Sequence, residues 1–69
     1  MDEAVTVFYD ALSATFDDAE HSVGERRFIT IGYSSRRRLL VVSHTKRGNA
    51  TRIISARRAT AGERKRHET

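Results

Sequence analysis

Arg27-Phe-Ile-Thr-Ile-Gly-Tyr33 and Leu39-Leu-Val-Val-Ser-His-Thr45 are consecutive β-prone segments, and Ala50-Thr-Arg-Ile-Ile-Ser-Ala56 is a third. The first alternates with a period of two, as a half-buried strand does. The second is apolar on both sides, which is expected of a central strand. The connections between them are short and polar, and Gly48 can take the positive φ that a tight turn requires. These segments therefore predict an antiparallel meander.

The flanking segments predict helices. Residues 2–12 carry apolar side chains at a helical spacing, and we expect Val5, Phe8 and Leu12 to face the core, with the acidic start of the helix free. A brief strand at 14–16 and a polar loop up to residue 25 follow. Thr60 and Glu63 have the spacing of a capping box and open a second helix that runs to residue 68. This helix is almost entirely charged, so we expect it to be frayed or docked against an acidic surface.

Length and composition set the limits of the fold. The 69 residues predict a single small domain, 1–69, of the α+β class: a short N-terminal helix, a three- to four-stranded antiparallel sheet and a basic C-terminal helix. Without cysteine, neither a disulfide nor a thiolate zinc site can form. The longest apolar run is too short to cross a bilayer, and the N-terminus lacks a signal pattern. We expect a soluble cytoplasmic protein that needs no cofactor or metal.

The charge is distributed unevenly along the chain. Residues 1–34 hold two basic and seven acidic side chains, net −5, whereas residues 35–69 hold eleven basic and two acidic ones, net +9. A small protein with one cationic half is suited to a polyanion or an acidic protein partner. Arginine dominates the basic half, and its planar guanidinium fits phosphate oxygens. The basic surface is predicted to comprise Arg36, Arg37, Arg38, Lys46, Arg47, Arg52, Arg57, Arg58, Arg64, Lys65 and Arg66. Contact with nucleic acid is the sharper interpretation, and a merely solvated face is the alternative.

Two groups of residues are candidates for chemistry. His44 shares a strand face with Leu40 and Val42, so it is either an inert core histidine or a proton donor or acceptor in phosphodiester cleavage. Strict alternation places Arg52 on the face of Ala56. Arg52, with Arg57 and Arg58, either forms structural ion pairs, for which Glu20 and Glu25 are available, or stabilises phosphate charge. His21 and His67 are expected to be surface residues.

Four motifs occur in order along the chain: Glu25-Arg-Arg-Phe-Ile-Thr-Ile-Gly32, Arg38-Leu-Leu-Val-Val-Ser-His-Thr45, Arg52-Ile-Ile-Ser-Ala-Arg-Arg-Ala-Thr60 and Glu63-Arg-Lys-Arg66. Together they resemble the BrnT toxins of bacterial type II toxin–antitoxin systems. The resemblance covers nearly the whole chain, from Glu3 onward. It implies a RelE-like fold and a metal-independent endoribonuclease that arrests translation. It also implies inhibition by a BrnA-type antitoxin of the ribbon-helix-helix class, with a homodimer within the toxin–antitoxin complex.

The resemblance also implies which residues border the RNA. The expected catalytic residues are Glu25, His44 and Arg57. The expected RNA-binding residues are Arg27, Arg52, Arg58, Arg64 and Lys65. In this scheme Arg57 and Arg58 bind and neutralise phosphate, Arg27 and Arg52 position the scissile group, and either His44 or Glu25 moves the proton. The second hypothesis is a non-catalytic basic module that binds RNA or an antitoxin.

The chain departs from the family pattern in two places. Family members usually begin with a further strand and a lysine-bearing helix that ends in a Lys-His-Gly turn, and this chain is expected to lack both. An absent strand leaves a sheet edge without a neighbour. The second departure is His67, which stands where the family often has tyrosine.

Overall fold

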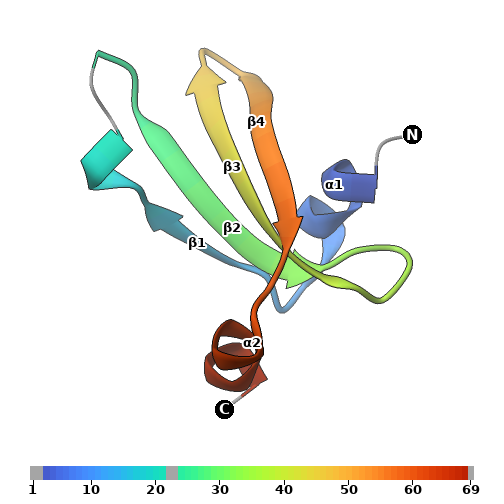
Figure 1. Cartoon of the computed structure of the whole chain (residues 1–69). Coiled ribbons are helices and arrows are strands. Elements are labelled where there is room, and N and C mark those ends of the chain that lie inside the picture. Colours follow the sequence, from blue (N-terminus) through green and yellow to red (C-terminus); the bar gives the residue numbers. More distant parts are fainter. Residues whose placement is uncertain (1–2, 22–23, 69) are drawn as a thin grey trace.

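The computed structural model describes residues 3–21 and 24–68, and it has an α+β fold. Its elements are α1 (Glu3–Thr6), the 3₁₀ turn η1 (Val7–Tyr9), β1 (Ala14–Asp17), η2 (Ala19–His21), β2 (Arg27–Tyr33), β3 (Leu39–Arg47), β4 (Ala50–Arg58) and α2 (Ala61–Glu68). The strands form one antiparallel sheet in the order β1-β2-β3-β4 (Figure 1). The predicted meander between two terminal helices is confirmed. β2 has the predicted bounds, whereas β3 and β4 each extend two residues beyond them.

The register of β3 defines two faces of the sheet. Leu40, Val42 and His44 point to one face, called here the inner face. Their neighbours Leu39, Val41, Ser43 and Thr45 point to the other, called the groove face. Directly paired residues on adjacent strands share a face, so the register assigns each strand residue to one of the two. The four apolar residues from Leu39 to Val42 are all buried, which confirms that β3 is the central strand.

The core of the inner face differs from the prediction. Ala4 and Val7 pack against Leu40 and Val42, with Ile53 beside them. The helix that was expected over 2–12 ends at Thr6 and tightens into η1, so its apolar stripe does not extend to Leu12. Leu12 is 75% exposed, and the prediction that Val5, Phe8 and Leu12 face the core is wrong for Leu12; Phe8 and Val5 are only partly covered. Asp2 lies outside the described residues.

A carboxylate turns the chain after η1. Asp10 accepts hydrogen bonds from the backbone N–H groups of Tyr33, at 2.8 Å, and Leu12, at 3.1 Å. The bond from Tyr33 is the main reason that the pKa of Asp10 lies below its usual value. This contact fixes the chain against the end of β2 and directs Leu12 toward the groove face.

The acidic start of α1 is held, not free as predicted. Ser34 Oγ donates to Glu3 Oε2 at 2.6 Å, and Arg38 Nε lies 3.8 Å from the same oxygen. The backbone N–H of Ser35 donates to Thr6 Oγ1 at 2.8 Å. The turn between β2 and β3 therefore fastens α1 to the sheet.

The second helix has the predicted cap. Glu63 N–H donates to Thr60 Oγ1 at 3.2 Å, and Thr60 N–H donates to Glu63 Oε1 at 2.9 Å. Neither this helix nor α1 has the length and apolar character that crossing a membrane requires, and this holds for every helix in residues 3–21 and 24–68.

Gly32 provides a stability test. A Cβ at this position would lie 2.8 Å from the Cβ of Ser13 and 3.1 Å from Val7 Cγ1, so both neighbours would have to move. We expect Gly32→Ala to lower the free energy of unfolding by about 1–3 kcal/mol, as overpacked cores do. The measurement is urea denaturation followed by circular dichroism.

Gly62 is the matched control. No atom lies within 4 Å of a Cβ built there, and the residue is in α2. Gly62→Ala should leave stability unchanged or raise it by up to about 1 kcal/mol. Equal stability of the Gly32→Ala variant and the wild type would show that Ser13 and Val7 are not closely packed against Gly32.

Candidate nucleic-acid interface

One end of the groove face carries a row of cations. Arg27 and Arg52 flank Thr45, each paired with it across a neighbouring strand, so all three side chains share the groove face. Glu25 and Arg47 lie at the same end and form a two-bond ion pair of 3.2 and 3.4 Å. Arg47 is the main cause that holds the pKa of Glu25 below its usual value, and the charge of Arg52 acts in the same direction. The ion-pair partner of Glu25 is thus Arg47, where the sequence suggested Arg52.

A β-bulge places Arg57 on the same face. Ser55 pairs with Ser43, but Ile53 pairs with His44, so Ile54 has no direct partner and the alternation of β4 shifts by one residue. Arg57 therefore pairs with Val41, on the groove face together with Arg52. The expectation that Arg52 shares a face with Ala56 is wrong, because Ala56 pairs with Val42 on the inner face.

Arg57 connects the sheet to α2. Its Nη1 and Nη2 atoms donate to Glu63 Oε1 and Oε2 at 2.8 and 2.9 Å. This bond is the chief reason that the pKa of Glu63 falls to about 2, and the backbone N–H of Thr60 contributes next. The same carboxylate thus caps the helix and binds the sheet.

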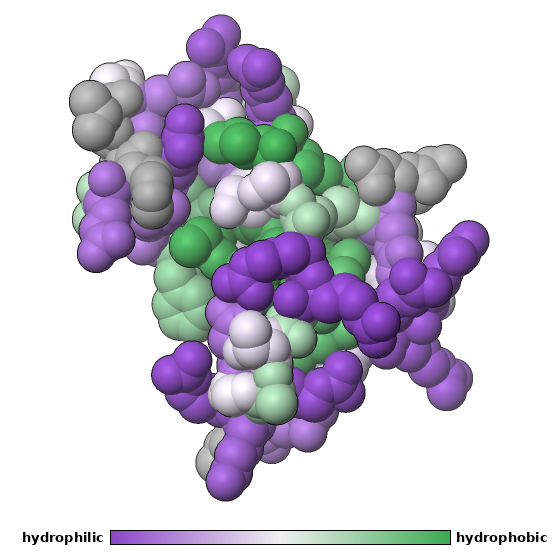
Figure 2. Space-filling model, in the orientation of Figure 1, coloured by the Kyte–Doolittle hydropathy of each residue, from purple (hydrophilic) through white to green (hydrophobic). Residues whose placement is uncertain are grey.

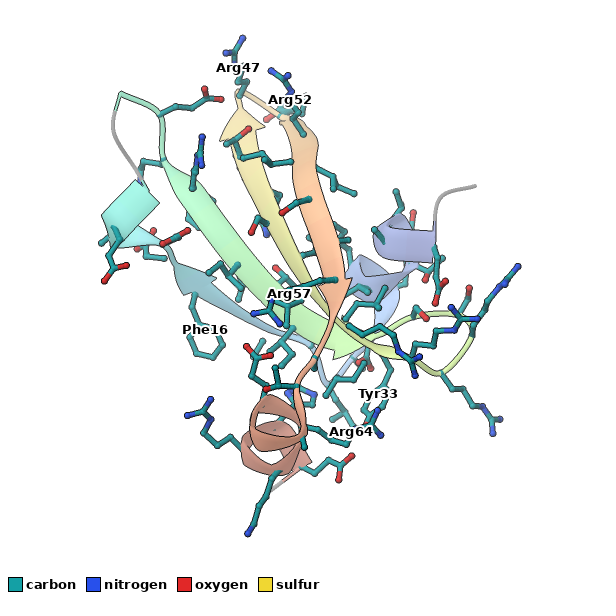
Figure 3. All side chains as sticks on the ribbon, viewed as in Figure 1. Phe16, Tyr33, Arg47, Arg52, Arg57 and Arg64 are labelled. Atoms are coloured by element: carbon teal, nitrogen blue, oxygen red, sulfur yellow. The ribbon has the colours of Figure 1, made fainter. Side chains whose placement is uncertain are left out.

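A second set of polar contacts holds the C-terminal end of α2. Tyr33 Oη donates to Glu68 Oε1 at 2.7 Å, and the rings of Tyr33 and His67 lie 6.0 Å apart. The helix was expected to be frayed or docked on an acidic surface. It is docked, but its own carboxylates bind an arginine and a tyrosine of the sheet, so the predicted sign of the contact is wrong. Arg64 and Lys65 are exposed on α2, and Figure 3 shows Arg64 near Tyr33 at this end of the molecule.

A groove of about 490 Å³ lies between the sheet and α2. Its apolar lining comes from the groove face and the segment before β1: Leu12, Ala14, Phe16, Ile29, Ile31 and Val41. Its polar lining comes from α2: Glu63, Arg66 and His67. Figure 2 shows this face, with apolar atoms in the middle and hydrophilic side chains around them.

Sequence reasoning missed two residues of this groove. His67, expected simply on the surface, is partly buried in the groove wall. Phe16 projects from β1 and is 58% exposed (Figure 3). A signal for His67 was available, because Glu63 and His67 are four residues apart and so share one helix face. The side chain of His21 lies outside the described part of the chain.

His44 lies on the opposite face from Arg57. It is 7% exposed, its Nε2 is 2.8 Å from Thr30 Oγ1, and the rings of Phe8 and Phe28 pack against it. Burial lowers its pKa from 6.5, because the imidazolium is poorly solvated there. Its position is that of the core-histidine alternative.

The other predicted residues are distributed between the two faces. Arg58 pairs with Leu40, so it belongs to the inner face, where it borders a hollow beside Ala4. All eleven basic residues of residues 35–69 are exposed. The structure thus gathers Glu25, Arg27, Arg52 and Arg57 on or beside the groove face and separates them from His44 and Arg58. Among the described residues, no group of three or more His, Asp or Glu side chains could hold a metal ion.

The fold and the cationic face define a small α+β protein whose exposed surface suits an anionic partner. A family model described as the ribonuclease toxin, BrnT, of type II toxin–antitoxin systems matches residues 1–63, and the chain belongs to this family. The resemblance drawn from the four sequence motifs is therefore confirmed. A comparison with curated proteins gave no match.

The burial of His44 predicts a pH dependence of stability. Its pKa is lowered from 6.5 in the folded state, so the unfolded chain binds this proton more readily. Stability should be full above about pH 6.5 and fall as the pH drops below it, by at most about 1.4 kcal/mol per pH unit. Urea denaturation at several pH values between about 5 and 8, the range over which histidine titrates, measures this slope.

Substitution of single histidines identifies which of them causes this pH dependence of stability. His44→Gln should remove this part of the slope, whereas His67→Gln, outside the core, should keep it. An undiminished slope in the His44→Gln protein would contradict the assignment.

The Glu63 carboxylate provides a second titration. Its folded pKa of about 2 lies below the unfolded value of 4.5, so its stabilising contribution is present above 4.5 and is lost as the pH falls toward 2. We expect Arg57→Gln to raise the pKa of Glu63, measured by NMR titration of the side-chain carboxyl carbon. Arg64→Gln, which removes the same charge from α2 itself, should change it less. An equal shift in both variants would show that general charge, and not the bidentate bond, sets this pKa.

Proposed function

We propose that this chain is an endoribonuclease that cleaves RNA without a metal ion and arrests translation. Its activity is restrained by an antitoxin of the BrnA, ribbon-helix-helix type. Membership of a ribonuclease toxin family, matched over residues 1–63, carries the proposal. The cationic groove face supports it, because its exposed arginines are suited to phosphate oxygens. In this proposal residues 1–69 act as one domain.

The RNA backbone lies along the groove face in this proposal. Arg27 and Arg52 pair with Thr45, and Arg57 pairs with Val41. Thr45 and Val41 are four residues apart on β3, which is about 13 Å at roughly 3.3 Å per residue. The row between them presents Ser43 and Ser55, whose small side chains leave room above the sheet. Long arginine side chains from both ends can thus reach a phosphate held over the serines. Arg64 and Lys65 of α2 extend the cationic surface to neighbouring phosphates.

The proposed reaction is attack of the ribose 2′-oxygen on the adjacent phosphorus. The bond from phosphorus to the 5′-oxygen breaks, giving a 2′,3′-cyclic phosphate and a free 5′-hydroxyl. Glu25 is ionised at neutral pH, because Arg47 holds its pKa low, and it accepts the 2′-hydroxyl proton. A proton from solvent is delivered to the leaving 5′-oxygen. Arg52 and Arg57 neutralise the charge that develops on the phosphorane.

This assignment gives His44 a supporting role. Catalysis by its imidazole would require the inner face to open, since the ring is buried, with Phe28 stacked on it and Phe8 in a T-shaped contact. Arg58 is also on the inner face. In this proposal it contacts the RNA where the RNA strand passes round the edge formed by β4. The proton-transfer role therefore falls to Glu25 among the three residues proposed as catalytic.

The deciding variants remove charged groups of the proposed site. We expect the Arg52→Ala/Arg57→Ala double variant and Glu25→Gln to cut RNA at least on the order of 100-fold more slowly than the wild type, because each removes a group that acts in the transition state. Cleavage is followed at low ionic strength in EDTA. Arg26→Ala is the control, since Arg26 pairs with Asp17 and lies over the Phe28 ring on the inner face. Equal rates for the control and the double variant would exclude the groove face as the site.

A non-catalytic basic module is the second candidate. The observation that favours it is that Glu25 and Arg57 both form bidentate ion pairs within the protein. Such a module would bind RNA or an antitoxin through the same surface but leave RNA intact. RNA binding with no cleavage by the wild type would support this function over the first.

A further inference from the structure

The groove beside α2 has an apolar floor and a polar wall. Its floor is apolar and open to solvent, with Phe16 58% and Leu12 75% exposed. Its wall is polar, formed by Glu63, Arg66 and His67 of α2. Its volume, about 490 Å³, is in the range of sites that hold small ligands or single groups of a larger one.

The charges around the groove select an anion. Arg66 lines it directly, and Arg57 stands at its border, bonded to Glu63 and paired with the floor residue Val41. Arg64 and Lys65 are exposed on the same helix. An occupant that fits must combine a flat apolar portion with negative charge beside it, which describes a nucleotide.

The position of Phe16 specifies how the apolar portion is held. Phe16 lies on edge strand β1, pairs with Ile29 and thus projects from the groove face. Figure 3 shows it on one side of the groove, with Arg57 extending over the sheet from the other. An exposed aromatic ring near arginines is the arrangement on which proteins stack the bases of single-stranded nucleic acid.

We propose that this groove binds one nucleotide of single-stranded RNA. The base stacks on Phe16 and lies on the apolar floor, its edge faces His67, and its phosphate faces Arg66 and Arg57. The proposal rests on the proposed function and adds a base-binding subsite beside the cationic row where the backbone is cut. His67 is a positioning residue here, since it contacts the base and takes no part in bond breaking.

A tryptophan in place of Phe16 tests the proposal directly. The chain contains no tryptophan, so Phe16→Trp and Tyr9→Trp each introduce a single fluorescent reporter. Tyr9 is an exposed aromatic outside the groove, 79% exposed in η1, and serves as the matched control. The ligand is a single-stranded 2′-O-methyl RNA, which the proposed reaction cannot cleave. Stacking should quench the fluorescence of the Phe16→Trp protein and leave that of the Tyr9→Trp protein unchanged.

Affinity provides the second measurement. With the same labelled RNA, Phe16→Leu should raise the Kd on the order of tenfold, because it keeps an apolar floor but removes the stacking ring. The same substitution at Tyr9, Tyr9→Leu, should leave the Kd unchanged. An RNA backbone without bases should bind both leucine variants equally, since only the phosphates remain to be recognised.

The outcomes separate this inference from the proposed function. Quenching confined to the Phe16→Trp protein, with the tenfold loss in Phe16→Leu, supports the subsite. RNA that is bound and cleaved with no quenching and no loss overturns the subsite and leaves the ribonuclease function standing. A wild type that does not bind RNA overturns both.

Discussion

Burial of β3 on both faces is the constraint on which the rest of the structure depends. Leu40 and Val42 need cover on the inner face, and Leu39 and Val41 need it on the groove face. Ala4 and Val7 cover Leu40 and Val42 on the inner face, with the β2–β3 turn holding α1 in place through Glu3. The groove face is covered only in part, by α2, and the remaining apolar surface forms the floor of the groove. The small core thus leaves part of the groove face exposed at Leu12 and Phe16.

The charged half of the molecule is arranged by one irregularity in the sheet. Without the bulge at Ile54, residues 52 and 57 would point to opposite faces, because strand side chains alternate. With it, Arg52 and Arg57 share the groove face at about 13 Å. Two cations separated by small side chains form a surface suited to a phosphate backbone, whereas the same residues on two faces would only add to solubility.

The attachment of α2 is electrostatic where most helices are held by apolar packing. It has no buried residues among those described, and its contacts to the sheet include the Arg57–Glu63 and Tyr33–Glu68 bonds and the Tyr33–His67 ring contact. Exposed ion pairs contribute little stability, so the helix is held more weakly than α1. In the proposed complex an RNA phosphate and Glu63 are alternative partners for the Arg57 guanidinium. Binding of RNA and the position of α2 are therefore linked through one side chain.

The local pattern of the sequence was sufficient for the elements and their order. Period-two alternation gave β2, the doubly apolar run gave β3 as the central strand, and the Thr60–Glu63 spacing gave the cap of α2, because each depends on residues close together in the chain. Tertiary structure decided three features: the bulge, the early end of α1 and the docking of Glu63 on Arg57. Each of them depends on a partner on another element. For the same reason the sequence identified the arginines, the glutamate and the histidine, but only the register showed that His44 is buried away from the others.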